Sequence, residues 1–198
     1  MRVTTAVGAD AVPHMAALGR LRRQVFRDWP YLYDGTDMAE AAYTATYETC
    51  PRAGLVIAWD GPGDTAEPVG MATCLPMADE DAHVQAPFVQ AGLPVEDWFY
   101  FGESVLLPAY RGQGVGVAFF KHREAHARSF GAYRHATFCA LQRPADHPLR
   151  PVDAKPLDGF WRNRGYAPLP GIQCTMRWRD LTTGGDMDHA MQFWGKAL

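Results

Sequence analysis

The feature that most constrains this 198-residue chain is a short glycine-rich run near its middle, residues 106–116. It follows an apolar, aromatic segment, 98–107, which is typical of a buried strand, and it leads into residues 115–130, whose apolar spacing is helical. Glycine allows a positive φ and a close approach of a ligand to the main chain. The unpaired N–H groups and the dipole at a helix start favour an anion. The run therefore predicts a cradle for phosphate or pyrophosphate.

Two common phosphate cradles do not match this run. A nucleotide P-loop has Lys followed by Ser or Thr after its last glycine, whereas Val115 and Gly116 follow Gly114. A dinucleotide fingerprint would place a third glycine where Val117 stands, and an acidic residue at the end of a second strand is missing as well. An enzyme of the NAD type is therefore disfavoured.

A third pattern matches. Arg111-x-x-Gly114-x-Gly116 lies within Pro108-Ala109-Tyr110-Arg111-Gly112-Gln113-Gly114-Val115-Gly116, which resembles motif A of the GNAT superfamily of N-acetyltransferases. Residues 160–166 resemble a late segment of the same family. Residues 29–35, 101–104 and 193–194 look like a bacterial subgroup of it. The resemblance covers most of the chain and implies that acetyl-CoA or coenzyme A binds at Arg111, Gly112, Gln113, Gly114, Val115 and Gly116.

Periodicity along the chain predicts one α/β domain spanning residues 1–198. Strands are expected at 2–7, 55–59, 69–75, 98–107, 136–141 and 172–178. Helices are expected after Met15, up to Pro30, and at 38–48, 84–90, 115–130, 157–164 and 187–197. The order predicts a single mixed sheet of about six to seven strands with helices on both faces. The resemblance implies the GNAT fold, with strands 98–107 and 136–141 splayed at the cofactor site.

The resemblance also assigns roles around that splay. The main chain at Val105, Leu106 and Leu107 is expected to meet the pantetheine arm, and Gly102 is expected to form a bulge. Glu103 is the candidate catalytic base, because a carboxylate in an otherwise apolar strand is partly desolvated and its pKa rises. A structural or cation-binding role for Glu103 is the alternative.

Residues further from the glycine run are assigned by the same resemblance. Tyr31, Tyr33 and Asp34 lie where the family builds its acceptor pocket, and they could enclose a cationic amine. Trp161 stands where the family has a tyrosine proposed as general acid, so a tyrosine acid is in doubt. The acidic segment 79–97 is expected to be a solvated loop around the short helix at 84–90, with a lid as the alternative.

Charge and cysteine content exclude several other classes. The formal net charge is −3, which provides no field for nucleic acid or an anionic membrane. Arg20, Arg22, Arg23 and Arg27 are interpreted as the solvated face of a helix. His122 and His126 do not match a zinc motif, so no metal is expected. Four unpaired cysteines and no visible signal segment suggest a cytoplasmic protein.

The predicted function is transfer of an acetyl group to a primary amine, in the first instance that of a small molecule. Acetylation of a protein lysine or N-terminus is one alternative, and a catalytically silent acyl-CoA-binding module is another. A homodimer is left open, and the sequence does not identify the acceptor.

Overall fold

A computed structural model describes residues 1–198, apart from the side chain of Asp64. Its seven strands form one sheet in the order β1-β2-β3-β4-β5-β7-β6. The strands are β1 (Arg2–Val7), β2 (Gly54–Asp60), β3 (Glu67–Pro76), β4 (Trp98–Leu106), β5 (His135–Leu141), β6 (Ala167–Asp180) and β7 (Gly185–Ala197). Every neighbouring pair is antiparallel except β4 and β5, which run parallel. The predicted mixed sheet is confirmed.

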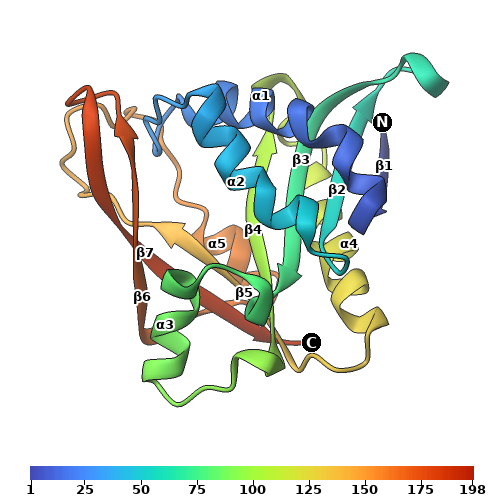
Figure 1. Ribbon diagram of the computed structural model, residues 1–198. Helices are drawn as coiled ribbons and strands as arrows, with labels where there is room; N and C mark the ends of the chain where they lie inside the picture. The colour runs from blue at the N-terminus through green and yellow to red at the C-terminus, as the bar shows by residue number, and fades with distance from the viewer.

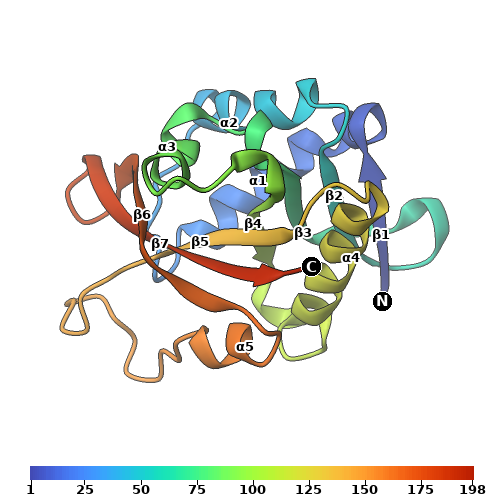
Figure 2. The same ribbon diagram turned by 90° about the horizontal axis from the view of Figure 1, so that it is seen from below.

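Helices cover both faces of this sheet, as Figures 1 and 2 show. One face carries α1 (Met15–Phe26), α2 (Asp37–Thr49) and α3 (Ala82–Gln90), and the other carries α4 (Val115–Ser129) and α5 (Asp158–Arg162). Leu18 of α1 and Phe88 of α3 share one buried cluster, while Phe119 and Phe120 of α4 pack against the opposite face. The sheet is thus the middle layer of three.

The main error of the sequence prediction concerns residues 187–197, which form strand β7 and not a helix. In the structure β7 lies between β5 and β6 and pairs with both (Figure 1). Its main-chain groups are therefore bonded on two sides, which outweighs the helix propensity of its Met, Ala and Gln residues. His189, Met191 and Phe193 are buried in alternation, which is the period of a strand.

The short helix predicted at 84–90 is confirmed within segment 79–97. Much of it forms α3, whose Val84 and Phe88 are fully buried in the core beneath β6 and β7. Over these residues the segment is therefore packed on the core and not solvated. Among the described residues, no helix is both long and apolar enough to cross a membrane.

The two central strands separate soon after they meet. Parallel pairing of β4 with β5 is limited to Trp98 with His135, Phe99 with Ala136 and Tyr100 with Thr137. Beyond Tyr100, β4 pairs only with β3. The remaining edge of β4 is therefore not paired with β5, as the resemblance implied, and we call this divergence of the two strands the slot.

A bulge lies where the slot opens. The register between β3 and β4 shifts so that Gly102 and Glu103 together oppose Thr73. A side chain at Gly102 would place its Cβ 2.3 Å from both the Thr73 Oγ1 and the Tyr47 hydroxyl, so only glycine fits. The bulge turns Glu103 toward α1, where its side chain contacts Arg22.

Candidate active site

The glycine-rich turn leaves the start of α4 open. Gly112 and Gly114 adopt φ of +76° and +85°, and Gly114 is the N-cap of the helix with no capping side chain. A Cβ on either glycine would meet nothing within 4 Å. The first hydrogen bond within α4 runs from the Ala118 N–H to the Gly114 carbonyl. The N–H groups of Val115, Gly116 and the following residue have no intrahelical acceptor, so the turn fits a pyrophosphate.

Neighbouring contacts fix the shape of this turn. Arg111 Nε donates to the Leu106 carbonyl at 3.2 Å, and Gln113 Nε2 donates to the Ala109 carbonyl at 3.0 Å. Phe160 of α5 packs against Gly116, where an added Cβ would lie 3.1 Å from the ring. Arg111 is exposed beside the open helix end, and a guanidinium there can pair with phosphate oxygens.

Only part of the predicted pantetheine contact faces the slot. Leu107 N–H donates to the Val69 carbonyl at 3.0 Å, toward β3. Hydrogen-bonded pairs alternate along an antiparallel ladder, so Val105 also directs its main chain toward β3. Leu106 directs its N–H toward the slot instead. Among the three residues of the prediction, Leu106 is the one placed to donate there.

Glu103 is a buried carboxylate on β4, close to this slot. Its side chain is 6% exposed, and its Oε2 accepts a hydrogen bond from Arg22 Nη1 at 2.7 Å. Its Oε1 is buried without a hydrogen-bond partner in the described part of the chain. Burial raises the pKa of Glu103, Arg22 opposes that rise and Glu40 adds to it, so the pKa is about 7. This carboxylate can therefore gain and lose a proton near neutral pH.

Arg22 also binds a second carboxylate. Its Nε donates to Glu40 Oε2 at 2.6 Å, and its guanidinium lies 3.5 Å from the centre of the Tyr43 ring. We call Glu40, Arg22 and Glu103 the carboxylate cluster. With two carboxylates and one guanidinium, the cluster carries an excess negative charge when both acids are ionised.

The interpretation of Arg22 as part of a solvated face was therefore wrong. Its side chain is 11% exposed and points into the protein. The spacing contained the signal, since Arg22 lies four residues after Leu18 and four before Phe26, and both are buried. Glu40 was not singled out at all. It begins a buried stripe on α2 that continues with Thr44 and Tyr47.

We call residues 29–35 the aromatic loop, and two of its three predicted pocket residues, Tyr31 and Tyr33, approach this cluster. Tyr31 packs on Phe26 with ring centres 4.2 Å apart, and burial with nearby Cys139 and Glu103 raises the pKa of its phenol. Burial and adjacent Glu40 raise the pKa of Tyr33 to about 12. Asp34 is directed elsewhere, because it forms ion pairs with surface residues, Arg27 at 3.1 Å and Arg179 at 2.9 Å.

Several other candidates pack against or bond to neighbouring protein groups. Trp161 packs between Phe138 and Trp194, at ring distances of 5.2 and 5.0 Å. His122 bonds Thr5 Oγ1 at 2.9 Å, and His126 bonds the Arg52 carbonyl at 2.8 Å, so each half-buried imidazole has a protein partner. Apart from the undescribed Asp64 side chain, no group of metal-ligating residues is gathered in the structure.

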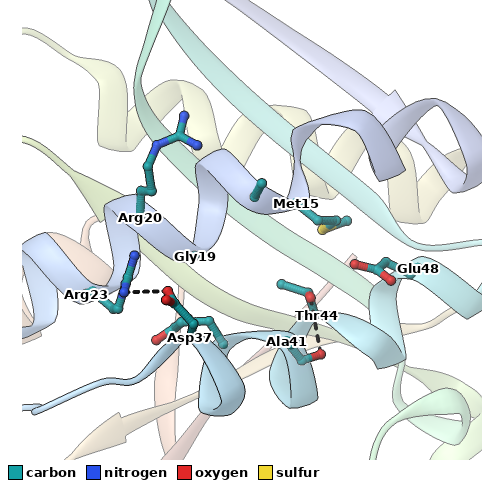
Figure 3. A pocket seen from close by; sticks show the side chains of 10 residues that line it. Met15, Gly19, Arg20, Arg23, Asp37, Ala41, Thr44 and Glu48 are labelled. Atoms are coloured by element: carbon teal, nitrogen blue, oxygen red, sulfur yellow. Dashed lines mark hydrogen bonds and ion pairs between the residues drawn. The ribbon is translucent and has the colours of Figure 1, made fainter.

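A surface groove of about 390 Å³ is lined by residues of α1 and α2 (Figure 3). Figure 3 shows Arg20 and Arg23 on α1, with Asp37 and Glu48 on α2. Glu40 also lines the groove. The carboxylate cluster thus lies between the groove on one side and β4 on the other.

Comparison with known proteins places this site in a family. The profile described as the acetyltransferase (GNAT) family matches residues 19–149, more than half of the chain. The chain therefore belongs to the GNAT acetyltransferase family. It is an acetyltransferase whose cofactor is acetyl-CoA, and the turn at α4 fits that cofactor.

Solved structures agree on the fold. An aminoglycoside 6'-N-acetyltransferase complexed with coenzyme A has a TM-score of 0.60 at 14% identity, over 100% of this chain and 97% of that one. NAA60 of Arabidopsis thaliana with a bisubstrate analogue gives 0.61 at 10%, over 100% and 99%. A GCN5-related N-acetyltransferase from Kribbella flavida gives 0.59 at 16%, over 99% and 98%. No curated protein matches the sequence significantly.

Proposed function

We propose that this acetyltransferase acetylates the primary amine of a small cationic molecule, with Glu103 as its general base. The observation that carries the proposal is the state of Glu103. It is buried on β4 beside the open slot, has one oxygen without a partner and has a pKa of about 7. A base with a pKa near the operating pH is well matched to removing a proton from an ammonium group.

The cofactor side of the proposal uses the open turn and the β4 edge. The main-chain N–H groups at Gly114 to Gly116 and the Arg111 guanidinium would hold the pyrophosphate. The Leu106 N–H, directed into the slot, would donate a hydrogen bond to the bound cofactor. When bound, acetyl-CoA supplies the acetyl group as a thioester.

The acceptor side favours a cation. When both acids are ionised the carboxylate cluster has an excess negative charge, and Tyr31 and Tyr33 place aromatic rings near it. An ammonium group is attracted by both features. Oε1 of Glu103, which has no protein partner, is the atom that would accept the proton.

The aromatic loop favours a small acceptor over a protein. Arg143, just after β5, donates to the main-chain carbonyls of Pro30 and Tyr31, each at 2.9 Å, and Trp178 Nε1 donates to the Tyr31 carbonyl at 3.2 Å. These bonds hold the loop against β6, so that the aromatic rings near the cluster are fixed in place. Acetylation of a lysine or an N-terminus remains the alternative.

The test is a thiol-release assay with acetyl-CoA, a panel of small diamines and amino sugars, and a parallel panel of peptides. We expect turnover with small amines, and Glu103→Gln should lower kcat by about 10²- to 10⁴-fold. Glu48→Gln, an exposed carboxylate on α2, is the matched control. Turnover with peptides alone would contradict the acceptor class. A raised KM with an unchanged kcat would make Glu103 a binding residue and not a base.

A further inference from the structure

The carboxylate cluster has an arrangement that a simple buried ion pair would not need. Arg22 gives one edge to Glu40 and another to Glu103, and each carboxylate keeps its Oε1 buried without a hydrogen-bond partner in the described structure. One guanidinium therefore serves two acids. Such a set is neutral overall only when one of the acids carries a proton.

We propose that Glu40 is a positioning residue for Glu103: it holds one edge of the shared Arg22 guanidinium and adds a second negative charge, which keeps Glu103 able to take up a proton. The inference rests on the proposed role of Glu103 as base. Without Glu40, Arg22 and Glu103 would form a one-to-one pair, and that pairing would favour the ionised form of Glu103.

The position of Glu40 on α2 favours a negative charge on its side chain. Glu40 lies in the first turn of α2, whose N-cap Thr36 accepts a hydrogen bond from the Ala39 N–H at 3.2 Å. The positive end of the helix dipole favours negative charge there. Glu103 lies on a strand and has no such dipole. The proton is therefore expected on Glu103.

Close packing of the two helices holds Glu40 in place. Gly19 of α1 faces it, and a Cβ at Gly19 would lie 3.2 Å from the Glu40 Cβ. A larger residue at position 19 would push α2 away from Arg22. The short distance between α1 and α2 thus sets how Arg22 is divided between its two partners.

The other charged or titratable groups near the cluster do not duplicate Glu40. Tyr31 and Tyr33 approach from the aromatic loop, and both have raised phenol pKa values. Tyr43, on α2, places its ring against the Arg22 guanidinium. Arg123 approaches from α4 and donates to the Glu103 main-chain carbonyl at 3.4 Å. Glu40 is the other carboxylate bonded to Arg22.

The test is Glu40→Gln in the full chain, with the carboxyl carbon of Glu103 followed by ¹³C NMR across the pH range. Loss of the signal in Glu103→Gln assigns it. We expect the pKa of Glu103 to fall by roughly one to two units, because a negative neighbour is lost and Arg22 then pairs with Glu103 alone. The acid limb of the pH–rate profile should move by the same amount. Glu48→Gln, on the same helix and groove, should leave both unchanged.

Two further measurements separate charge from packing. Glu40→Asp keeps the charge and should hold the pKa of Glu103 close to that of the parent chain. An equal shift in the Asp and Gln variants, or no shift in a natively folded Gln variant, would overturn the proposal. In the unmodified chain, the Glu103 signal should titrate around its pKa of about 7. If it does not, the proposal fails even where the Gln variant cannot fold.

The same data test the coupling between Glu40 and Glu103 separately from the role of Glu103 as the base. A pKa that shifts while the pH–rate profile stays fixed would support the coupling between Glu40 and Glu103. It would at the same time contradict Glu103 as the base. The NMR titration needs neither cofactor nor acceptor, so it can be read before the acceptor is known.

Discussion

Single residues determine whether the buried charges of this site are tolerated. Arg22 is the cation that both carboxylates of the cluster share, and its side chain is 11% exposed. Removing one partner of a buried ion pair leaves an uncompensated charge, which commonly costs about 3–5 kcal/mol. We therefore expect Arg22→Met to lower the free energy of unfolding by about that amount. Urea unfolding monitored by circular dichroism measures it.

The loss in Arg22→Met should depend on pH. Burial already raises the pKa of Glu103, and without Arg22 to oppose that effect folding raises it further above its unfolded value. The unfolded state then binds fewer protons than the folded state, so stability falls as pH rises from about 4.5 through the folded pKa. The variant should be closer to the parent at about pH 5 than at about pH 8. Arg20→Met, an exposed arginine on the same helix, should change little at either pH. A pH-independent loss would contradict the uncompensated carboxylates.

Whether the sequence reveals one of these residues depends on whether the pattern is local or joins distant positions of the chain. Glu103 was predictable because it interrupts an apolar strand, and Arg111 to Gly116 because they form a contiguous motif. The pairing of Arg22 with Glu40 and Glu103 was not predictable, since it joins positions that are 18 and 81 residues apart. Periodicity could show that Arg22 lies on the buried stripe of α1, but not what it meets there.

At the scale of elements, the start of α4 is tested by two substitutions at one position. Gly114 has a φ of +85° and open space around its Cβ position. Gly114→Ala should cost about 1 kcal/mol of backbone strain and still bind coenzyme A. Gly114→Asp adds similar strain but also places a negative charge at the anion site, so it should abolish the thermal shift produced by coenzyme A. Equal shifts in both variants would exclude this turn as the pyrophosphate site.

The bulge in β4 is tested in the same way. Gly102→Ala would place a methyl group 2.3 Å from Thr73 Oγ1 and from the Tyr47 hydroxyl, and relieving that overlap must move the bulge. Overpacking of this kind typically costs about 1–3 kcal/mol. Gly159→Ala, in α5, has no atom within 4 Å of the added carbon and serves as the control. Comparable unfolding midpoints for the two variants would contradict the close contact.

The element that sequence reasoning missed, β7, shows where local signals compete. Residues 187–197 contain two apolar residues three apart, Met191 and Trp194, which suggested a helix face. They also contain His189, Met191 and Phe193 at every second position, and these three are buried. Both periods are present in the sequence. Only the neighbouring strands β5 and β6, far away in the chain, decide between them.

At the scale of the whole molecule, the two halves of the proposed site lie on different layers. The glycine-rich turn belongs to the start of α4, whereas the carboxylate cluster lies between β4 and the helices of the opposite face. Divergence of β4 from β5 leaves the open edge between them. The acceptor half also depends on the C-terminal strands, because the aromatic loop is held by the end of β6.

Because the end of β6 holds the aromatic loop, we make a prediction about Arg143, which contacts both. It donates to the buried carboxylate of Asp180 at 2.6 Å as well as to the loop carbonyls. The loop is bonded to β6 and the turn after it by the Asp34 and Leu181 N–H groups, each at 2.8 Å. Arg143→Met should loosen these bonds, so the two amides should exchange their hydrogens at least about tenfold faster. Hydrogen–deuterium exchange followed by NMR measures both rates.

Controls for Arg143 separate a local effect from global unfolding. Amides of β1 and β2, at the far edge of the sheet, should keep their rates, and the thermal shift with coenzyme A should persist because α4 is not touched. Arg150→Met removes an exposed arginine that bonds only the Ala145 carbonyl among the described residues, and it should change nothing. If the Asp34 and Leu181 amides exchange no faster in Arg143→Met, the loop is held by its own packing, and Arg143 does not couple the C-terminal strands to the acceptor half of the site.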